Sequence, residues 1–268
     1  MPTFRATDCV LHYLDEGTGR PVVFIHGFTC TGRFFERQRS FVGDRYRFLA
    51  PDLRSHGRSE KTLSGNTVQI QTRDLHELFT ELDLRSVVLV GWSNGTFNVW
   101  QYLHDCGGDR IAAVVLIDAS PCPLNRNDWS LGYWALRGLI GAMEAREADN
   151  QRFVRDVFLP RIFGNLPEPK EADWMAEEIL MMPATIAAAF GFQAMTRDYR
   201  NFVSGVRVPA LLCFGARSFV RLENATYLQG AMEDARLVVF AESGHSPFWE
   251  EADRFNHELS TFIDTLPI

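Results

Sequence analysis

A serine between two glycines is the residue in this chain best placed to do chemistry. Ser93 stands at the centre of Gly91-Trp92-Ser93-Asn94-Gly95, which follows the apolar run Val87–Val90 and precedes a second apolar run with helical spacing. A serine on so sharp a strand-to-helix turn needs small residues two positions before and after it, and here both are glycine. The turn raises the hydroxyl above the end of the strand, so the sequence predicts a serine nucleophile.

Serine becomes a strong nucleophile only when a base removes the proton from its hydroxyl. His245 stands in Glu242–Glu250, a loop that follows the last predicted strand and should reach the same edge of the sheet as Ser93. We therefore predict that His245 is the base. Three other histidines lie in helical patterns and are expected to be packing or surface residues.

Backbone N–H groups opposite the nucleophile are needed to hold the negative oxygen of a tetrahedral intermediate. The turn His26-Gly27-Phe28 follows the apolar strand Pro21–Ile25 and can present the N–H of Phe28. The N–H of Asn94, at the start of the helix after the serine, can provide the second donor. We predict an oxyanion hole made by Phe28 and Asn94, and we expect the His26 side chain to brace its loop by hydrogen bonding.

Apolar runs predict the elements that must carry these residues. Two short strands are expected in residues 3–15 and single strands over 21–25, 46–50, 87–90, 113–118, 209–214 and 237–240, with helices over 34–41 and 66–83. Strands and helices in alternation indicate a mainly parallel sheet with helices on both faces. Ligand sites of such sheets lie at the carboxyl ends of the strands, where Ser93 and His245 are predicted.

Residues 123–206 differ in composition from the rest of the chain. They are rich in Trp, Phe and Met, have helical spacing and contain no convincing strand. We predict that they form a helical cap inserted over the strand ends, and that residues 1–122 and 207–268 form the core domain. Most of the aromatic side chains must pack within the cap. Three tryptophans are expected to contact the substrate: Trp92, Trp129 and Trp134.

Composition limits the kinds of partner that the chain can have. The 268 residues carry a formal charge of -7 and are 46% hydrophobic, which argues against nucleic acid or an anionic membrane as a main partner. The chain has no run of about 18 apolar residues to span a membrane and no apolar signal core at its N-terminus, so a cytoplasmic location is expected. The five cysteines lack metal-ligand spacing, so we expect them to be reduced and expect neither a metal nor another cofactor. The oligomeric state is not predicted.

Taken together, the motifs resemble those of the α/β-hydrolase superfamily, and within it the esterase and non-haem haloperoxidase branch. The matching stretches are His26–Phe28, Pro51–Ser59, Gly91–Gly95 and Gly244–Glu250, in the order of the family. They cover both halves of the core, while no motif covers the cap. The resemblance implies an α/β-hydrolase fold, with a mainly parallel eight-stranded sheet, helices on both faces and an inserted helical cap.

The chain departs from the family pattern at the acid that should orient the base. Many members carry Gly-x-x-Asp after the strand that here ends at Phe214, but this chain has Gly215-Ala216-Arg217-Ser218. Asp118 ends the strand after the helix that follows Ser93, and some members, including haloalkane dehalogenases and cofactor-free dioxygenases, place their acid there. We predict Asp118 as the acid, with Glu223 and a dyad that lacks an acid as the alternatives.

These residues and the resemblance predict a serine hydrolase that cleaves an ester, or a similarly activated acyl bond, through an acyl-serine intermediate. The apolar cap favours a small, uncharged, hydrophobic substrate. Haloperoxidase activity would be a side reaction through a peracid, with no metal required. The alternatives are a cofactor-independent dioxygenase and a binding protein that has lost turnover. Such dioxygenases usually carry His after the serine, whereas this chain has Asn94.

Overall fold

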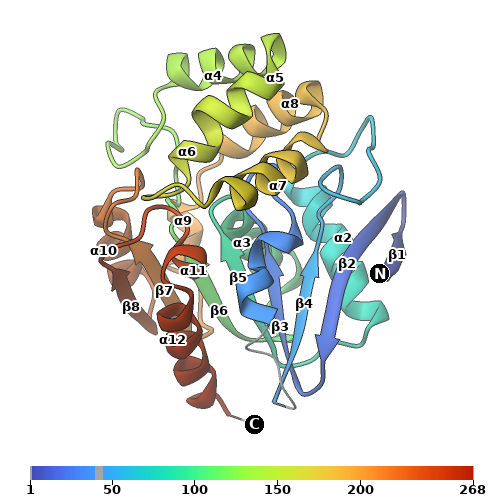
Figure 1. The fold of residues 1–268 in the computed structure, drawn as a ribbon. Helices are drawn as coiled ribbons and strands as arrows, with labels where there is room; N and C mark the ends of the chain where they lie inside the picture. The colour runs from blue at the N-terminus through green and yellow to red at the C-terminus, as the bar shows by residue number, and fades with distance from the viewer. Residues whose placement is uncertain (1, 40–44, 268) are drawn as a thin grey trace.

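Eight strands form one sheet in the order β1-β2-β4-β3-β5-β6-β7-β8 (Figure 1). The structure is a computed structural model that describes residues 2–39 and 45–267. Its strands are β1 (Thr3–Ala6), β2 (Cys9–Gly17), β3 (Arg20–Ile25), β4 (Tyr46–Pro51), β5 (Val87–Trp92), β6 (Ile111–Ile117), β7 (Ala210–Gly215) and β8 (Ala235–Phe240). β2 pairs antiparallel with β1 and β4, and all other pairs are parallel. The predicted eight-stranded, mainly parallel sheet is confirmed.

Both faces of the sheet are buried because its central strands are apolar throughout. In β5, Val87 and Leu89 belong to one hydrophobic core, while Val88 and Val90 belong to the other, as the two-residue period of a strand requires. The first core is covered by α2 (Val68–Glu81), α3 (Gly95–Cys106) and α10 (Leu222–Ala231). The second is covered by the 3₁₀ helix η1 (Gly32–Phe35), α11 (Pro247–Glu250) and α12 (Ala252–Asp264), and the short α1 (Glu36–Arg39) directly follows η1.

Two predicted helices differ from the observed ones at their ends. The helix expected over 34–41 is a 3₁₀ turn followed by the short α1, and residues 40 and 41 lie outside the described residues. The helix expected over 66–83 is α2, which begins at Val68. It begins there because the hydroxyl of Thr67 accepts a hydrogen bond from the N–H of Ile70 at 3.3 Å, a favourable N-cap.

A helical segment, residues 123–206, connects β6 to β7 and lies over the carboxyl ends of the strands (Figure 1). Its helices are α4 (Leu136–Ala148), α5 (Asn150–Arg152), the π-helical η2 (Phe153–Phe158), α6 (Leu159–Arg161), α7 (Pro169–Leu180), α8 (Ala184–Met195) and α9 (Arg200–Val203). Arg58, in the loop after β4, binds the buried carboxylate of Glu178 on α7 with two hydrogen bonds of 2.9 and 3.1 Å. We call this segment the helical insertion.

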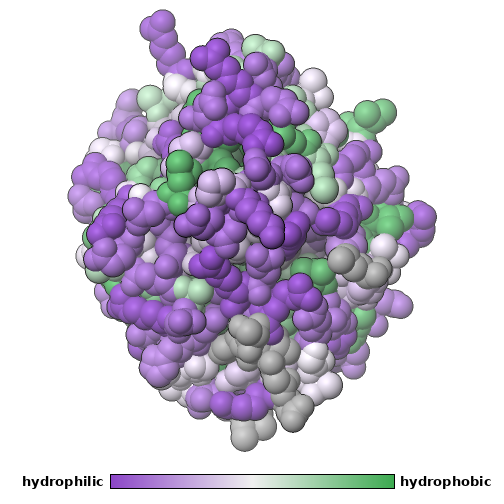
Figure 2. Space-filling model, in the orientation of Figure 1, coloured by the Kyte–Doolittle hydropathy of each residue, from purple (hydrophilic) through white to green (hydrophobic). Residues whose placement is uncertain are grey.

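The surface of the molecule is mostly hydrophilic on the face shown in Figure 2, where hydrophobic residues appear in separate patches. Across the residues that the structure describes, no single helix has both the length and the apolar character needed to cross a membrane. The pair α7 and α8 taken together meets that criterion, but the two helices are bent by 85° relative to each other.

Candidate active site

Ser93 occupies the tight turn between β5 and α3 in a strained backbone conformation. Its φ angle is 53°, in the left-handed region that side chains other than glycine rarely adopt. Gly91 and Gly95 permit this turn: a Cβ on Gly91 would lie 2.7 Å from the side chain of Val99, and one on Gly95 would overlap the carbonyl oxygen of Ile25. The turn therefore depends on both glycines, as the sequence predicts.

Asp118 and His245 come together although 127 residues separate them in the chain. Asp118 directly follows β6, and its Oδ2 lies 2.5 Å from Nδ1 of His245. Both side chains are buried. The Nδ1–H donates to the carboxylate, which leaves Nε2 as the basic nitrogen of the neutral ring. The geometry thus has the base-and-orienter arrangement of hydrolytic triads.

Ser218, which stands where many family members have aspartate, contacts Asp118 instead of His245. Its hydroxyl donates a hydrogen bond to Oδ2 of Asp118, while the N–H of Gly215 donates to Oδ1 at 3.1 Å. Glu223, the alternative acid, is exposed on α10 and pairs with Arg221 at 2.7 Å. Among the described residues, the carboxylate that reaches the ring of His245 is therefore Asp118.

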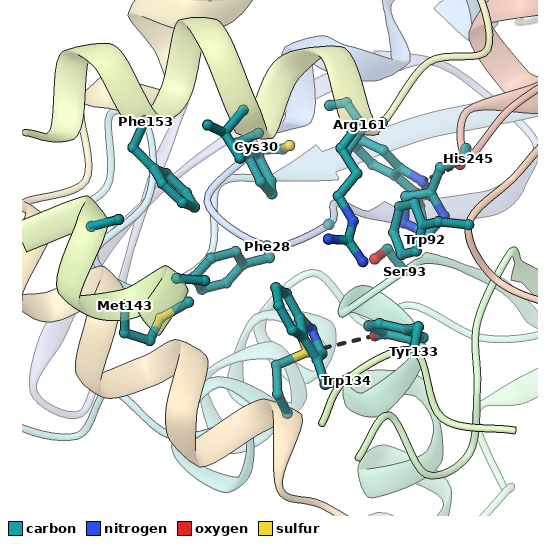
Figure 3. Close-up of a pocket in the computed structure, with 18 residues that line it drawn as sticks. Phe28, Cys30, Trp92, Ser93, Tyr133, Trp134, Met143, Phe153, Arg161 and His245 are labelled. Atoms are coloured by element: carbon teal, nitrogen blue, oxygen red, sulfur yellow. Dashed lines mark hydrogen bonds between the residues drawn. The ribbon is translucent and has the colours of Figure 1, made fainter. Parts of the chain in front are cut away.

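Ser93 and His245 line one cavity of about 290 Å³ that lies between the strand ends and the helical insertion (Figure 3). The Ser93 hydroxyl makes no hydrogen bond to the His245 ring in the described part of the chain. Such bonds are often long in the absence of substrate and shorten when it binds. The indole N–H of Trp92 donates to the backbone carbonyl oxygen of His245 at 2.7 Å, and the ring of Phe219 packs on the imidazole with 4.4 Å between the ring centres.

The backbone N–H groups of the two predicted oxyanion donors belong to the loop after β3 and to the turn between β5 and α3. Among the described residues, neither the N–H of Phe28 nor that of Asn94 is paired with a protein oxygen, although both residues are almost fully buried. Phe28 and its neighbour Gly27 line the cavity on the β3 side. Unpaired buried N–H groups are rare in folded proteins, so they indicate a place for a ligand oxygen.

The cavity is lined mainly by apolar side chains, several of them from the helical insertion. Trp92 and Trp134, two of the three tryptophans expected to contact the substrate, line it. Trp129 does not: its indole N–H donates to the carbonyl of Cys122 at 2.8 Å, and its ring packs 5.0 Å from Tyr227 of α10. The structure therefore makes Trp129 a packing residue. No cluster of three His, Cys, Asp or Glu suited to a metal ion occurs in the described residues.

Sequence reasoning missed Arg161, a charged residue that lines the cavity together with Ser93 and His245. Figure 3 shows its guanidinium pointing into the cavity on the side of Ser93. Its α-carbon belongs to α6, in the apolar stretch Phe158–Phe163. A single charged residue within an apolar run is the sequence feature that could have indicated Arg161. The charge of such a residue must reach water, an anion or an aromatic face.

His26 braces the loop after β3, as the sequence predicts. Its Nδ1–H donates to the carbonyl of Gly27 at 2.9 Å, and its Nε2 accepts the N–H of Leu53 at 3.0 Å. The ring of His56 packs 4.8 Å from it and donates to the carbonyl of Arg54. Complete burial lowers the pKa of His26 and lowers that of His56 still further. Both rings therefore favour the neutral form.

Comparison with known proteins gives consistent matches over almost the whole chain. A family model described as the alpha/beta hydrolase family matches residues 22–258. A non-heme chloroperoxidase of Burkholderia pyrrocinia is 35% identical over 278 residues, with 98% of this chain and 99% of the relative covered. A pimeloyl-[acyl-carrier protein] methyl ester esterase of Nitrosomonas europaea is 25% identical, covering 91% and 96%. An esterase structure from Exiguobacterium antarcticum superposes with a TM-score of 0.93 at 23% identity, covering 98% and 99%.

Proposed function

Because the chain belongs to the alpha/beta hydrolase family, we propose that it is a serine hydrolase that cleaves an ester of a small, largely hydrophobic substrate. The observation that carries this proposal is the buried Asp118–His245 pair, whose imidazole lines one cavity with Ser93 on its strained turn. Relatives named as an esterase and as a chloroperoxidase support a hydrolytic or closely related acyl-transfer reaction.

In the proposed reaction, the hydroxyl oxygen of Ser93 attacks the carbonyl carbon of the ester while Nε2 of His245 takes the hydroxyl proton. Asp118 keeps the ring in the tautomer with Nδ1–H and stabilises the imidazolium that forms. The imidazolium then gives its proton to the leaving alkoxide, which departs as the alcohol. Water, deprotonated by His245, hydrolyses the acyl-serine and releases the acid.

The unpaired N–H groups of Phe28 and Asn94 would stabilise the negative oxygen of each tetrahedral intermediate. A preorganised donor of this kind contributes about 3–4 kcal/mol to the transition state in comparable sites. The helical insertion would act as a cap that shields the reaction from bulk water and shapes the apolar part of the pocket. Apolar side chains such as Phe153 and Met143 lie on the opposite side of the cavity from His245 (Figure 3).

A second candidate activity is perhydrolysis, which the name of the chloroperoxidase relative favours. Hydrogen peroxide would replace water in the second half of the reaction, so that the acyl-serine yields a peracid and regenerates Ser93. The peracid would then oxidise halide to hypohalous acid and revert to the carboxylic acid. This activity uses the same residues, so it should be lost together with hydrolysis.

Hydrolysis of p-nitrophenyl acetate and butyrate tests the proposal. We expect turnover in the wild type and its loss in Ser93→Ala, whereas Ser204→Ala, which changes an exposed serine on the helical insertion, should retain wild-type turnover. Oxygen uptake without ester cleavage would instead indicate a dioxygenase. Saturable ligand binding with neither reaction would indicate a binding protein.

A further inference from the structure

Arg161 has no anionic partner in the part of the chain that the structure describes. Among the described residues, its guanidinium makes no hydrogen bond and no ion pair. Its contacts are with two aromatic faces, the ring of Trp134 at 4.7 Å and that of Phe219 at 4.5 Å. Cation–π contacts use the face of the guanidinium and leave its N–H groups free to bind an acceptor in the plane.

Arg161 is also the only Arg, Lys, Asp or Glu among the described residues that line the cavity. Burial lowers the pKa of its guanidinium from the usual value, because the aromatic rings replace part of the water around the charge. The group still carries its positive charge at neutral pH. Arg161 as a whole residue is exposed to solvent, so the charge sits where the apolar cavity meets solvent.

The backbone that carries Arg161 is fixed to the loop that carries His245. The hydroxyl of Ser246 donates to the carbonyl of Ile162 at 2.7 Å. Glu250 accepts the N–H of Gly164 at 2.7 Å with one oxygen and the N–H of Gly244 at 2.9 Å with the other. The position of Arg161 relative to the site is therefore set by short hydrogen bonds, which is the preorganisation that a binding residue needs.

We propose that Arg161 binds a carboxylate of the substrate, so that the enzyme prefers esters that carry a free carboxylate near the scissile bond. This deepens the proposed function and rests on it. A planar carboxylate can accept two parallel N–H bonds from a guanidinium. The apolar walls would hold the hydrocarbon between the carboxylate and the ester. The substrate is then an anion with an apolar chain, which revises the uncharged substrate expected from the sequence.

A matched pair of substrates tests this preference. Monomethyl glutarate carries one free carboxylate, and dimethyl glutarate is its neutral counterpart. We expect wild-type kcat/KM to be higher for the monoester. In Arg161→Gln the ratio of monoester to diester kcat/KM should fall about 10- to 100-fold, the range for hydrogen bonds to a charged group. Arg161→Lys keeps the charge but not the planar guanidinium. Its ratio of monoester to diester kcat/KM should lie between that of the wild type and that of Arg161→Gln.

Two controls separate this role from a structural one. Arg152→Gln removes the same charge from an exposed position on α5 and should leave the ratio unchanged. Thermal unfolding of the Arg161 variants shows whether they fold. An equal loss of kcat/KM for both esters in Arg161→Gln would overturn the proposal, since it would mean that Arg161 serves packing or the oxyanion rather than a substrate carboxylate.

Direct binding keeps this result distinct from failure of the proposed hydrolysis. Calorimetric titration of Ser93→Ala with glutarate should show saturable binding that weakens at least tenfold when Arg161→Gln is added. If no ester is hydrolysed but this difference is seen, the proposed function fails and the carboxylate site stands. If esters are hydrolysed and glutarate binds both variants equally, the carboxylate site fails and the hydrolase stands.

Discussion

Three donors converge on the carboxylate of Asp118 and fix its orientation: the ring N–H of His245, the hydroxyl of Ser218 and the N–H of Gly215. Asp118 itself has a φ angle of 49°, a strained conformation that persists only where surrounding contacts hold it. The strand end before Asp118 therefore supplies the partner of His245. Ser218, on the loop after the neighbouring strand β7, contacts the same carboxylate oxygen of Asp118 and so lies close to the His245 ring.

Asp118→Asn should lower kcat for p-nitrophenyl butyrate about 10³- to 10⁴-fold. An amide cannot stabilise the imidazolium, and its NH₂ group can hold the ring in the wrong tautomer. Circular dichroism and thermal unfolding should show a folded variant, because the substitution keeps the size of the side chain. A kcat within tenfold of the wild type would exclude Asp118 as the acid.

Moving the carboxylate to position 218 gives a sharper test. The hydroxyl of Ser218 already contacts the oxygen that binds His245, so a carboxylate at 218 should reach the ring from the adjacent loop. We expect the double variant Asp118→Asn with Ser218→Asp to have a kcat at least tenfold higher than that of Asp118→Asn alone. Ser218→Ala alone, which removes one donor to Asp118, should reduce kcat only a few-fold. An unrecovered double variant would show that position 218 cannot orient the ring.

Residues that follow apolar strands could be predicted from the sequence, and residues whose direction depends on packing could not. Ser93, Asp118 and His245 each stand just beyond a strand, so the topology alone predicts that they approach one another. The direction of the Trp129 indole depends on the carbonyl of Cys122 and on a ring of α10, which no local pattern reveals. Arg161 was missed for the same reason, because its neighbours in space are distant in sequence.

At the scale of elements, the turn between β5 and α3 is where sterics outweigh helix propensity. Gly95→Ala would gain up to about 1 kcal/mol as the first residue of α3, but its Cβ would overlap the carbonyl oxygen of Ile25 and lie 2.8 Å from that of His26. Overpacking costs about 1–3 kcal/mol, and relief requires the loop with Phe28 to move. We therefore expect a lower free energy of unfolding, measured in urea, and a kcat reduced at least tenfold.

Gly141→Ala is the matched control for that substitution. Gly141 lies within α4, and a Cβ built on it has no heavy atom within 4 Å. The free energy of unfolding should rise by up to about 1 kcal/mol with kcat unchanged. If both alanine variants behaved alike, steric contact at Gly95 would not explain why the turn needs glycine.

Strands were predictable as elements, whereas helix ends and the helical insertion were predictable only in outline. Apolar runs of four to seven residues leave few alternatives when both faces of a sheet are buried. The helix α2 starts where the Thr67 cap places it, and the hydrophobic spacing alone does not fix that point. In the insertion, the π-helical turn Phe153–Phe158 is a rare form that hydrophobic spacing does not indicate. The helix α7 ends at Leu180, shortly before Pro183, because proline disfavours helical geometry in the residue that precedes it.

At the scale of the whole molecule, the helical insertion and the core meet through buried charges as well as apolar contacts. Glu178 of α7 binds Arg58 of the core. Arg146 of α4 is fully buried, with its guanidinium 5.3 Å from the ring centre of Phe28 and 3.4 Å from the hydroxyl of Thr29. Thus a helix of the insertion packs directly on the loop that presents the proposed oxyanion donor, so movement of one should displace the other.

We expect the His26–His56 pair to make the stability of the whole molecule depend on pH. Protonation of His26 would place a hydrogen on Nε2, which already accepts the N–H of Leu53. Nε2 of His56 is buried and has no hydrogen-bond partner among the described residues. Loss of hydration is the largest cause of both lowered pKa values. Smaller contributions to these pKa values come from nearby charges, which are Asp52 and Glu178 for His26, and Asp52 and Lys61 for His56. The folded state therefore disfavours the extra protons that the unfolded chain accepts.

Histidines in the unfolded chain titrate near pH 6.5. Above that pH both histidines are neutral in both states, so they should not make the free energy of unfolding depend on pH. As the pH falls below about 6.5 the unfolded state binds more protons, and stability should decrease by up to about 1.4 kcal/mol per pH unit for each histidine. Urea unfolding followed by tryptophan fluorescence between about pH 8 and pH 5 measures this slope. His56→Asn, which keeps a donor for the carbonyl of Arg54, should reduce it. Phe190→Leu is the control: it removes a ring whose centre lies 5.6 Å from that of His56 but leaves both histidines, so it should lower the free energy of unfolding equally at every pH. If His56→Asn kept the wild-type slope, the pH dependence would come from other groups.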